Sequence, residues 1–189
     1  MDNNTWRNTD SFTALRIIRK NFSRFGLSRI ANITSLDVIG IPVYICVRPR
    51  GLSVSISAGK GLSHVDAMVS AAMESIEMDV AESLESDSTV FKSYNELPVG
   101  ERIPFELLPV ISGSCFNGIR KINWVRGKLL GTDAPFFIPF DILTMNTFAI
   151  TSQLTSFAWG SNGLASSIDR DEAILSGLYE VIERDSLSC

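Results

Sequence analysis

The chain has 189 residues, of which 45% are hydrophobic and 20% are charged, so it is long and apolar enough for a domain with a sizeable core. Its 17 Lys+Arg and 21 Asp+Glu give a net charge of −4, which argues against general affinity for nucleic acid or anionic lipid. No apolar run approaches the ~20 residues that a membrane span needs. Residues 1–7 lack the apolar core of a secretion signal, so we expect a cytoplasmic protein.

Cysteine and histidine are too scarce to carry the chemistry. The cysteines are Cys46, Cys115 and Cys189, an odd number without close pairing that is typical of free thiols in a reducing compartment. Cys46 lies in an apolar run and is expected to be buried. His64 is the only histidine, so any His-dependent triad or His-rich metal site would have to include it. The sequence therefore directs attention to carboxylates.

The N-terminal third predicts one helix and three strands. Residues 11–25 predict an amphipathic helix that Ser11 caps and Gly26 ends. Its apolar positions recur at steps of three and four: Leu15, Ile18, Phe22 and Phe25. Strands are predicted at residues 27–33, 41–47 and 52–57, and the last two are expected to form a hairpin.

The remainder of the chain alternates helices and strands. A long helix is predicted from residue 63 to about 84, and Ser63 followed by Asp66 resembles a capping box. Residues 86–118, rich in Pro, Ser and Gly, predict loops with short elements. Strands are predicted at 119–125 and 136–140, residues 142–159 are ambiguous, and a last helix begins near Asp169. The interleaving indicates an α/β or α+β fold, which we expect to be a single domain over residues 1–189.

The two strongest predicted helices are similar to each other. Residues 66–79 align without gaps with residues 172–185, and the expected N-caps Ser63 and Asp169 correspond as well. The identical pairs are Ala67/Ala173, Ser70/Ser176, Glu74/Glu180, Ile76/Ile182, Glu77/Glu183 and Asp79/Asp185. Two copies of one unit suggest a duplication with a pseudo-twofold arrangement.

The polar positions that the copies share fall on one side of each helix, because steps of four, four and three residues place them about one turn apart. They are Asp66, Ser70, Glu74 and Glu77 in the first copy, and Glu172, Ser176, Glu180 and Glu183 in the second. The apolar positions, among them Leu178, Tyr179 and Ile182, are expected to pack into a core. If the copies face each other, the four glutamates converge on one volume and repel unless cations occupy it. Oxygen-only ligands favour Mg²⁺.

A solvated helix surface is the simpler interpretation of a single Glu-x-x-Glu. Neither of these helix faces, however, carries the lysines and arginines that usually balance a solvated acidic stripe, and Arg184, directly after Glu183, is the one exception. The doubled pattern therefore favours a functional site. We call Glu74, Glu77, Glu180 and Glu183 the acidic face.

Several stretches resemble motifs of the YcaO family. Residues 28–43 (SRIANITSLDVIGIPV) are similar to its N-terminal signature, and residues 57–62 (SAGKGL) to the loop before its first acidic helix. Residues 70–77 (SAAMESIE) resemble its first ATP-binding motif. Residues 161–165 (SNGLA), followed by residues 172–185 with their ending EVIERD, resemble the later one. The resemblance covers nearly the whole chain and implies a YcaO-like fold of duplicated sheet and helix units.

The resemblance implies an ATP site without a Walker A loop, and the chain lacks that motif. In YcaO-like enzymes, glutamates of two acidic helices hold Mg²⁺ ions that bridge the triphosphate. The matching positions here are Glu74, Glu77, Glu180 and Glu183. Ser70 and Arg184 are then expected to contact the nucleotide or its phosphates. Arg7 resembles an N-terminal basic residue of the family that reaches the phosphates.

The implied activity is ATP-dependent activation of a peptide backbone amide, as cyclodehydratases and thioamidation enzymes of RiPP biosynthesis perform it. A Cys, Ser or Thr side chain or external sulfide adds to the amide carbon, and phosphorylation turns the oxyanion into a good leaving group. Loss of phosphate leaves an azoline, a thioamide or an amidine. Metal ions and a cation such as Arg184 suit this transfer. The implied partner is a substrate peptide or protein; a protein that delivers substrate or sulfur, and a homodimer, are compatible with the sequence.

Gly59-Lys60-Gly61 precedes a helix N-terminus and has two interpretations. Its backbone N–H groups could bind an anion with Lys60 assisting, or the segment could be a flexible exit from the hairpin.

Two other functions remain open. YcaO-like proteins continue well past the second acidic helix, whereas this sequence stops at Cys189, so we expect a truncated YcaO-like domain without its C-terminal part. Such a chain could be a non-catalytic module that binds a peptide or partner, although retention of the acidic face and Arg184 favours the enzyme. A di-metal carboxylate protein is disfavoured, because neither acidic helix carries Glu-x-x-His.

Overall fold

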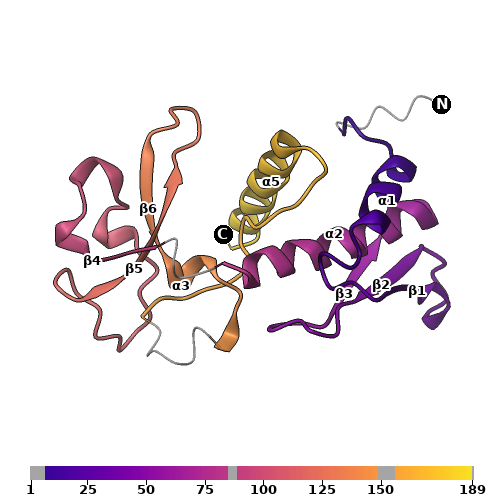
Figure 1. The fold of residues 1–189 in the computed structure, drawn as a ribbon, viewed down its shortest axis with the longest axis horizontal. Coiled ribbons are helices and arrows are strands. Elements are labelled where there is room, and N and C mark those ends of the chain that lie inside the picture. The colour runs from indigo at the N-terminus through magenta and orange to yellow at the C-terminus, as the bar shows by residue number, and fades with distance from the viewer. Residues whose placement is uncertain (1–6, 85–88, 149–155, 189) are drawn as a thin grey trace. The chain divides into compact units, whose positions relative to one another are not determined.

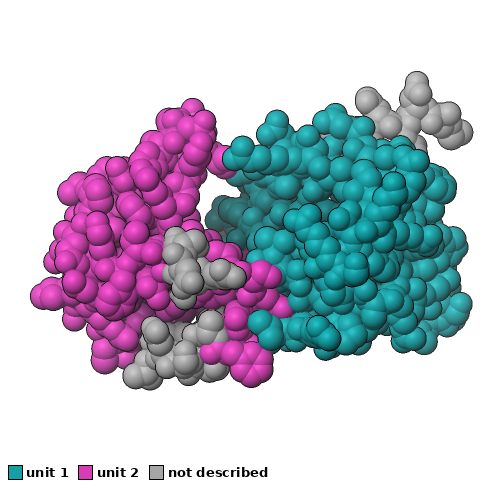
Figure 2. All heavy atoms as spheres, viewed as in Figure 1, with its two compact units in different colours: residues 1–80, 162–189 teal, residues 81–161 magenta. Residues whose placement is uncertain are grey.

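The chain folds into two compact units. The computed structural model describes residues 7–84, 89–148 and 156–188. The first unit comprises residues 1–80 and 162–189, and the second comprises residues 81–161 (Figure 2). Each unit contains a three-stranded antiparallel sheet together with helical segments, which confirms the mixed α/β class.

The first helix, α1 (Ser11–Lys20), is shorter than the helix predicted over residues 11–25. Asp10 rather than Ser11 is its N-cap, and the Asp10 carboxylate accepts a hydrogen bond of 3.0 Å from the Thr13 backbone N–H. The chain then continues in turns to Gly26, whose φ of +63° favours glycine. Phe22 and Phe25 still pack against the core, so the apolar spacing continues although the helix has ended.

The sheet of the first unit consists of β1 (Arg29–Asn32), β2 (Val43–Val47) and β3 (Ile56–Lys60) in that order. A 3-10 helix, Thr34–Leu36, lies between β1 and β2. The register pairs Val47 with Ile56 and Val43 with Lys60. The predicted strand at 52–57 is therefore displaced toward the C-terminus, because pairing with β2 extends it through Gly59 and Lys60.

The duplicated helices are α2 (His64–Glu82) and α5 (Arg170–Ser188) (Figure 1). Both predicted N-caps are confirmed. Ser63 Oγ accepts from the Asp66 N–H and Asp66 Oδ2 accepts from the Ser63 N–H, each at 3.2 Å. Asp169 Oδ1 accepts from the N–H groups of Asp171 and Glu172 at 2.9 and 3.2 Å.

The core of the first unit lies between α1, the sheet and α2. Its most deeply buried members are Ile18, Cys46, Ala67, Ala71 and Ala72. Cys46 is fully buried, as predicted. No helix among the described residues is long and apolar enough to cross a membrane.

The outer surface of α5 differs from the sequence expectation. Leu178, Tyr179 and Ile182 are 43%, 55% and 61% exposed, so the prediction that they pack into a core is wrong for the described chain. Gly177 marks the packed side of α5, where an added Cβ would lie 2.6 Å from the Gly163 carbonyl oxygen, and the helical repeat turns Leu178, Tyr179 and Ile182 away from that side.

The second unit contains β4 (Thr89–Ser93), β5 (Lys121–Lys128) and β6 (Pro135–Pro139) in that order. Between β4 and β5 lie short 3-10 helices: Tyr94–Glu96, Val99–Glu101 and Phe105–Leu107. The helix α3 (Phe140–Leu143) follows β6. The fully buried Trp124 packs with aromatic rings that include Tyr94, Phe116 and Phe157. The strands predicted near 119–125 and 136–140 are confirmed to within a few residues.

Candidate functional site

Glu77 of α2 occupies the most perturbed position of the acidic face. Burial, followed by the charges of Glu180 and Glu74, raises the pKa of its carboxyl to about 7, while hydrogen bonding by Ser166 opposes the shift. Glu180 belongs to α5, so the acids of the two helices lie within electrostatic reach of each other. Ser166 Oγ also donates to the Met73 carbonyl of α2 at 2.9 Å, which holds the segment before α5 against α2.

Glu74 lies one turn before Glu77 on α2. Partial desolvation raises the pKa of its carboxyl. As at Glu77, the folded protein disfavours the negative charge of this carboxylate, because the surrounding groups do not replace all the water that burial removes. A divalent cation would compensate it, because the carboxylates of Glu77 and Glu180 and the hydroxyl of Ser166 act on the same face, and oxygen donors of this kind suit Mg²⁺. These residues fit the metal that the sequence resemblance implies.

Glu180 is oriented by the loop before α5. Its Oε2 accepts from the Gly163 backbone N–H at 3.0 Å, and its Oε1 pairs with the Arg184 guanidinium one turn later. Arg184 also donates to the side-chain oxygen of Asn162. The loop and the helix therefore hold one carboxylate and one guanidinium side by side at the edge of the acidic face.

Glu183 and Ser70 are less constrained. Glu183 is exposed, and its side chain forms no hydrogen bond or ion pair with the described residues. Ser70 is half-buried, one turn before Glu74. Within residues 7–84, 89–148 and 156–188, no three His, Cys, Asp or Glu side chains are close enough together to form a ready metal cage. The acidic face is thus an open arrangement, in which repulsion disfavours a tighter cluster.

The third residues of both acidic helices bind the N-terminal segment. Asp66 accepts from the hydroxyls of Ser11 and Ser63; these hydrogen bonds lower the pKa of Asp66, and the charge of Arg7 contributes. Glu172, only 5% exposed, accepts from the Asn8 backbone N–H and, at 2.7 Å, from Ser167 Oγ. The chain around Arg7 is therefore tied to the first turns of α2 and α5.

The glycines beside Lys60 have a packing role. A Cβ on Gly59 would lie 2.0 Å from the Ala71 nitrogen, and one on Gly61 would lie 2.5 Å from the Asp66 Cβ, so only glycine lets β3 pass so close to α2. The Gly61 N–H donates to the Pro42 carbonyl at 3.2 Å and is not free for an anion. Lys60 is exposed at the end of β3, and its contact with an anion stays a prediction.

Sequence reasoning assigned no role to Gly163, Ser166 or Ser167, which contact acids of the site, or to Asn162, which accepts a hydrogen bond from Arg184. The stretch 161–165 was recognisable as a motif, but a motif does not say which of its atoms face which helix. The signal that could have found them is the cluster of small polar residues directly before the Asp169 cap.

Comparison with known proteins places this architecture in a defined class. Residues 58–189, which include both acidic helices, match the family model of the YcaO cyclodehydratase, described as ATP- and Mg²⁺-binding. The chain belongs to the YcaO family. The cofactors expected from the sequence, ATP and Mg²⁺, are those of this family.

Relatives are found in bacteria and archaea. The chain is 33% identical over 171 residues to an uncharacterized protein of the tfuA 3′ region of Rhizobium leguminosarum bv. trifolii, covering 89% of this chain and 40% of the relative. It is 36% identical over 176 residues to an uncharacterized protein of Methanothermobacter thermautotrophicus, covering 92% and 45%. The chain thus spans less than half the length of these curated relatives.

Two solved structures share the fold. YcaO from Methanopyrus kandleri, bound with AMPPCP and Mg²⁺, superposes with a TM-score of 0.72 at 27% identity, over 96% of this chain and 44% of that protein. A heterocyclase in complex with substrate and cofactor superposes with a TM-score of 0.72 at 19% identity, over 92% and 27%. The second likeness concerns the fold alone.

Proposed function

We propose that this chain supplies much of the nucleotide site of a YcaO-type enzyme that uses Mg·ATP to activate a peptide backbone amide. The observation that supports this most directly is the proximity of Glu77 and Glu180, two half-buried acids from the two copies of the repeat. A purely solvated surface would not raise the pKa of Glu77 to about 7. The family relation and the nucleotide-bound structural neighbour point to the same chemistry.

Each residue of the site has a proposed role. Glu74, Glu77, Glu180 and Glu183 would hold Mg²⁺ between the helices. The metal, when bound, neutralises phosphate charge and orients the γ-phosphoryl group. Arg184 remains exposed beside Glu180, where its guanidinium has donors left for the transferring phosphoryl oxygens.

The other end of the site would bind the rest of the nucleotide. Asp66 precedes Glu74 by about two turns, or roughly 12 Å along α2. Arg7, whose charge acts on Asp66, therefore lies far enough from Glu77 to contact a different part of the same nucleotide. Ser70, between them, would donate to a phosphate or the sugar.

The substrate would be a peptide or protein whose own side chain, or external sulfide, adds to the amide carbon. The oxyanion takes the phosphoryl group, and phosphate then departs with the former amide oxygen. We propose an azoline, a thioamide or a related product. The enzyme needs no nucleophile of its own, which agrees with the burial of Cys46 and the lack of a histidine beyond His64.

The thermal melt of this chain with and without millimolar Mg·ATP tests the proposal. A ligand at a hundred times its Kd stabilises by about 2.7 kcal/mol, or roughly 5–10 °C for a domain of this size. We expect a rise of that order that requires both Mg²⁺ and ATP. A cooperative melt that Mg·ATP leaves unmoved would favour the alternative, a non-catalytic YcaO-like module that binds a peptide or partner.

Two matched variants locate the binding. Glu74→Gln and Glu180→Gln should abolish the Mg·ATP-induced rise while the apo chain still melts cooperatively, because removing a carboxylate relieves repulsion on the acidic face. Glu106→Gln, an exposed change in the second unit, should keep the full rise. Unfolding of the apo protein by either site variant would show that these glutamates are structural instead.

A further inference from the structure

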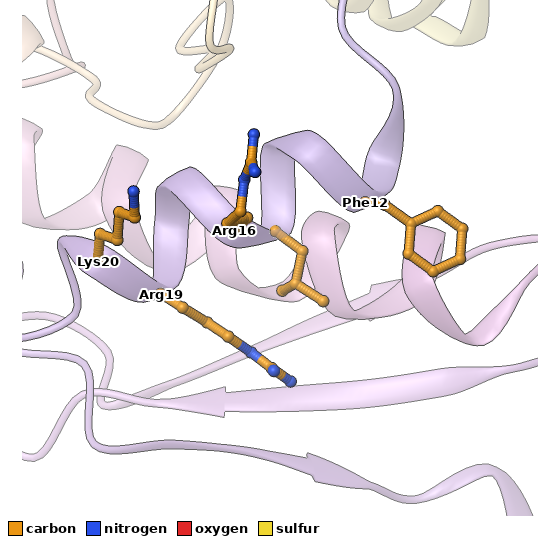
Figure 3. Close-up of a pocket in the computed structure, with 5 residues that line it drawn as sticks. Phe12, Arg16, Arg19 and Lys20 are labelled. Carbon is orange, nitrogen blue, oxygen red and sulfur yellow. The ribbon is translucent and has the colours of Figure 1, made fainter.

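The outer surface of α1 carries a shallow depression that the proposed nucleotide site does not use. Its volume is about 430 Å³, and its lining consists of Phe12, Leu15, Arg16, Arg19 and Lys20 (Figure 3). These positions recur at steps of three and four, so they share one broad side of the helix. We call this the α1 groove; none of the four glutamates of the acidic face lines it.

The charge of the α1 groove is opposite to that of the whole chain. Arg16, Arg19 and Lys20 form no ion pair with any carboxylate of the described residues. Asp10, the nearest acid along the sequence, is occupied as the helix cap through Thr13. In a chain of net charge −4, this leaves a local concentration of uncompensated positive charge.

The α1 groove also presents an apolar anchor. Phe12 is 74% exposed, and the buried Leu15 lies one turn further along the floor. In Figure 3 Arg16 and Lys20 point to one side of the helix, and Arg19 extends on the side toward which Phe12 points. A ligand in the groove would therefore meet an aromatic ring and cations on both flanks.

We propose that the α1 groove docks an acidic peptide segment that also carries apolar side chains. Guanidinium groups bind carboxylates in a fixed, two-pronged geometry, and a partner's apolar side chain would remove Phe12 from water. Duplex nucleic acid fits less well, because affinity for it grows with the number of phosphates neutralised, and three cations on a helix of about 15 Å neutralise few. The proposal does not depend on Mg·ATP, since the groove lies outside the acidic face.

A binding titration tests the docking site. The probe is a fluorescein-labelled peptide of alternating glutamate and leucine, and its twin has glutamine in place of every glutamate. We expect fluorescence anisotropy to detect binding of the acidic peptide but not of the twin, and to show weaker binding at higher salt. Arg16→Gln combined with Arg19→Gln should raise the Kd about tenfold, as the loss of two exposed charge pairs allows.

Controls separate docking from general charge effects. Phe12→Ser should also weaken binding, whereas Arg126→Gln, on β5 in the second unit, should leave the Kd unchanged. The side chains changed in these variants are all exposed: Phe12, Arg16, Arg19 and Arg126. Each variant should therefore keep the melting temperature of the parent chain. The Mg·ATP-induced rise in melting temperature should survive in the α1 variants, which distinguishes failure of this proposal from failure of the proposed nucleotide site.

Three results would overturn the docking proposal. One is absence of binding by the acidic peptide, and another is binding that the Arg16, Arg19 and Phe12 substitutions leave intact. The third is tighter binding of duplex DNA or of phosphatidylserine vesicles through the same side chains, which would assign the groove to phosphate groups.

Discussion

Glu77 illustrates how position decides the behaviour of a residue type. Glu77 and Glu183 occupy equivalent places in the repeat, yet Glu77 is half-buried with a pKa near 7 and Glu183 is exposed. The difference arises because Ser166 and Glu180 pack over Glu77, whereas no described residue covers Glu183. We therefore expect the two copies to contribute unequally to a metal site, with Glu77 the more buried ligand.

Asp66 provides a pH prediction at this scale. Its hydrogen bonds from Ser11 and Ser63 hold its pKa below the ordinary value of 3.8, so the carboxylate stabilises the folded state above that value. This contribution is lost as the pH falls through the lowered pKa. Asp66→Asn should cost about 1 kcal/mol of unfolding free energy at pH 7, a typical cap value, and nearly nothing near pH 2. Chemical denaturation at both pH values measures the difference.

The control for Asp66 is Asp133→Asn. Asp133 lies in a turn with φ of +54°, which asparagine adopts as readily, and its side chain is 81% exposed. Its substitution should change stability little at either pH. If Asp66→Asn lowered the unfolding free energy by the same amount at low pH, the contribution of Asp66 would depend on its shape and not on its charge.

At the scale of elements, α2 and α5 use small residues in the same way. Ala71 and Gly177 are equivalent in the repeat, and each receives a close glycine: Gly59 of β3 against Ala71, and Gly163 of the loop against Gly177. The duplicated helices thus share a crossing point as well as an acidic side. At α5 this crossing brings the Gly163 N–H to Glu180.

Gly177→Ala tests this crossing. Alanine would gain up to about 1 kcal/mol of helix propensity, but its Cβ would lie 2.6 Å from the Gly163 carbonyl oxygen, and overpacking costs about 1–3 kcal/mol. We expect a net loss of stability of about 1 kcal/mol by chemical denaturation, together with a smaller Mg·ATP-induced rise in melting temperature. Gly100→Ala, with open space around it, should be tolerated. If Gly177→Ala instead stabilised the protein, the loop at Gly163 would be able to move away from the added methyl group without a loss of stability, which would contradict this prediction.

At the scale of the whole molecule, the chain divides into two units, and the proposed nucleotide site lies within the first of them. Every residue of the acidic face, together with Arg7 and the loop at 162–167, belongs to the first unit. The second unit has its own sheet and its own aromatic core around Trp124. That the full chain acts as a single domain stays a prediction.

Hydrogen exchange tests this location. Mg·ATP should slow amide exchange in α2, in α5 and in residues 162–167, because cation binding between the helices restrains their opening. Amides of β4, β5 and β6 should be little affected. Glu180→Gln, under the same conditions, should abolish the protection. Protection confined to the second unit would contradict the assigned site.

Much of the first unit was predictable from local patterns. The caps at Ser63 and Asp169, the lengths of α2 and α5 and the alignment of their acids follow from helix periodicity and from residues within one turn of each other. The choice of Asp10 over Ser11 as the cap of α1 was not predictable, because Ser11 is engaged by Asp66, far along the chain. The displacement of β3 follows from its pairing with β2.

The sequence by itself determined the family, the repeat and the face on which the glutamates lie, since identity and helical spacing are properties of the chain. Only the tertiary structure decided that Glu77 is the perturbed acid, that Gly163 and Asn162 bind Glu180 and Arg184, and that Leu178, Tyr179 and Ile182 stay exposed. The physical reason is that burial and charge act through space, and the segments that meet at this site are separated by about half the chain.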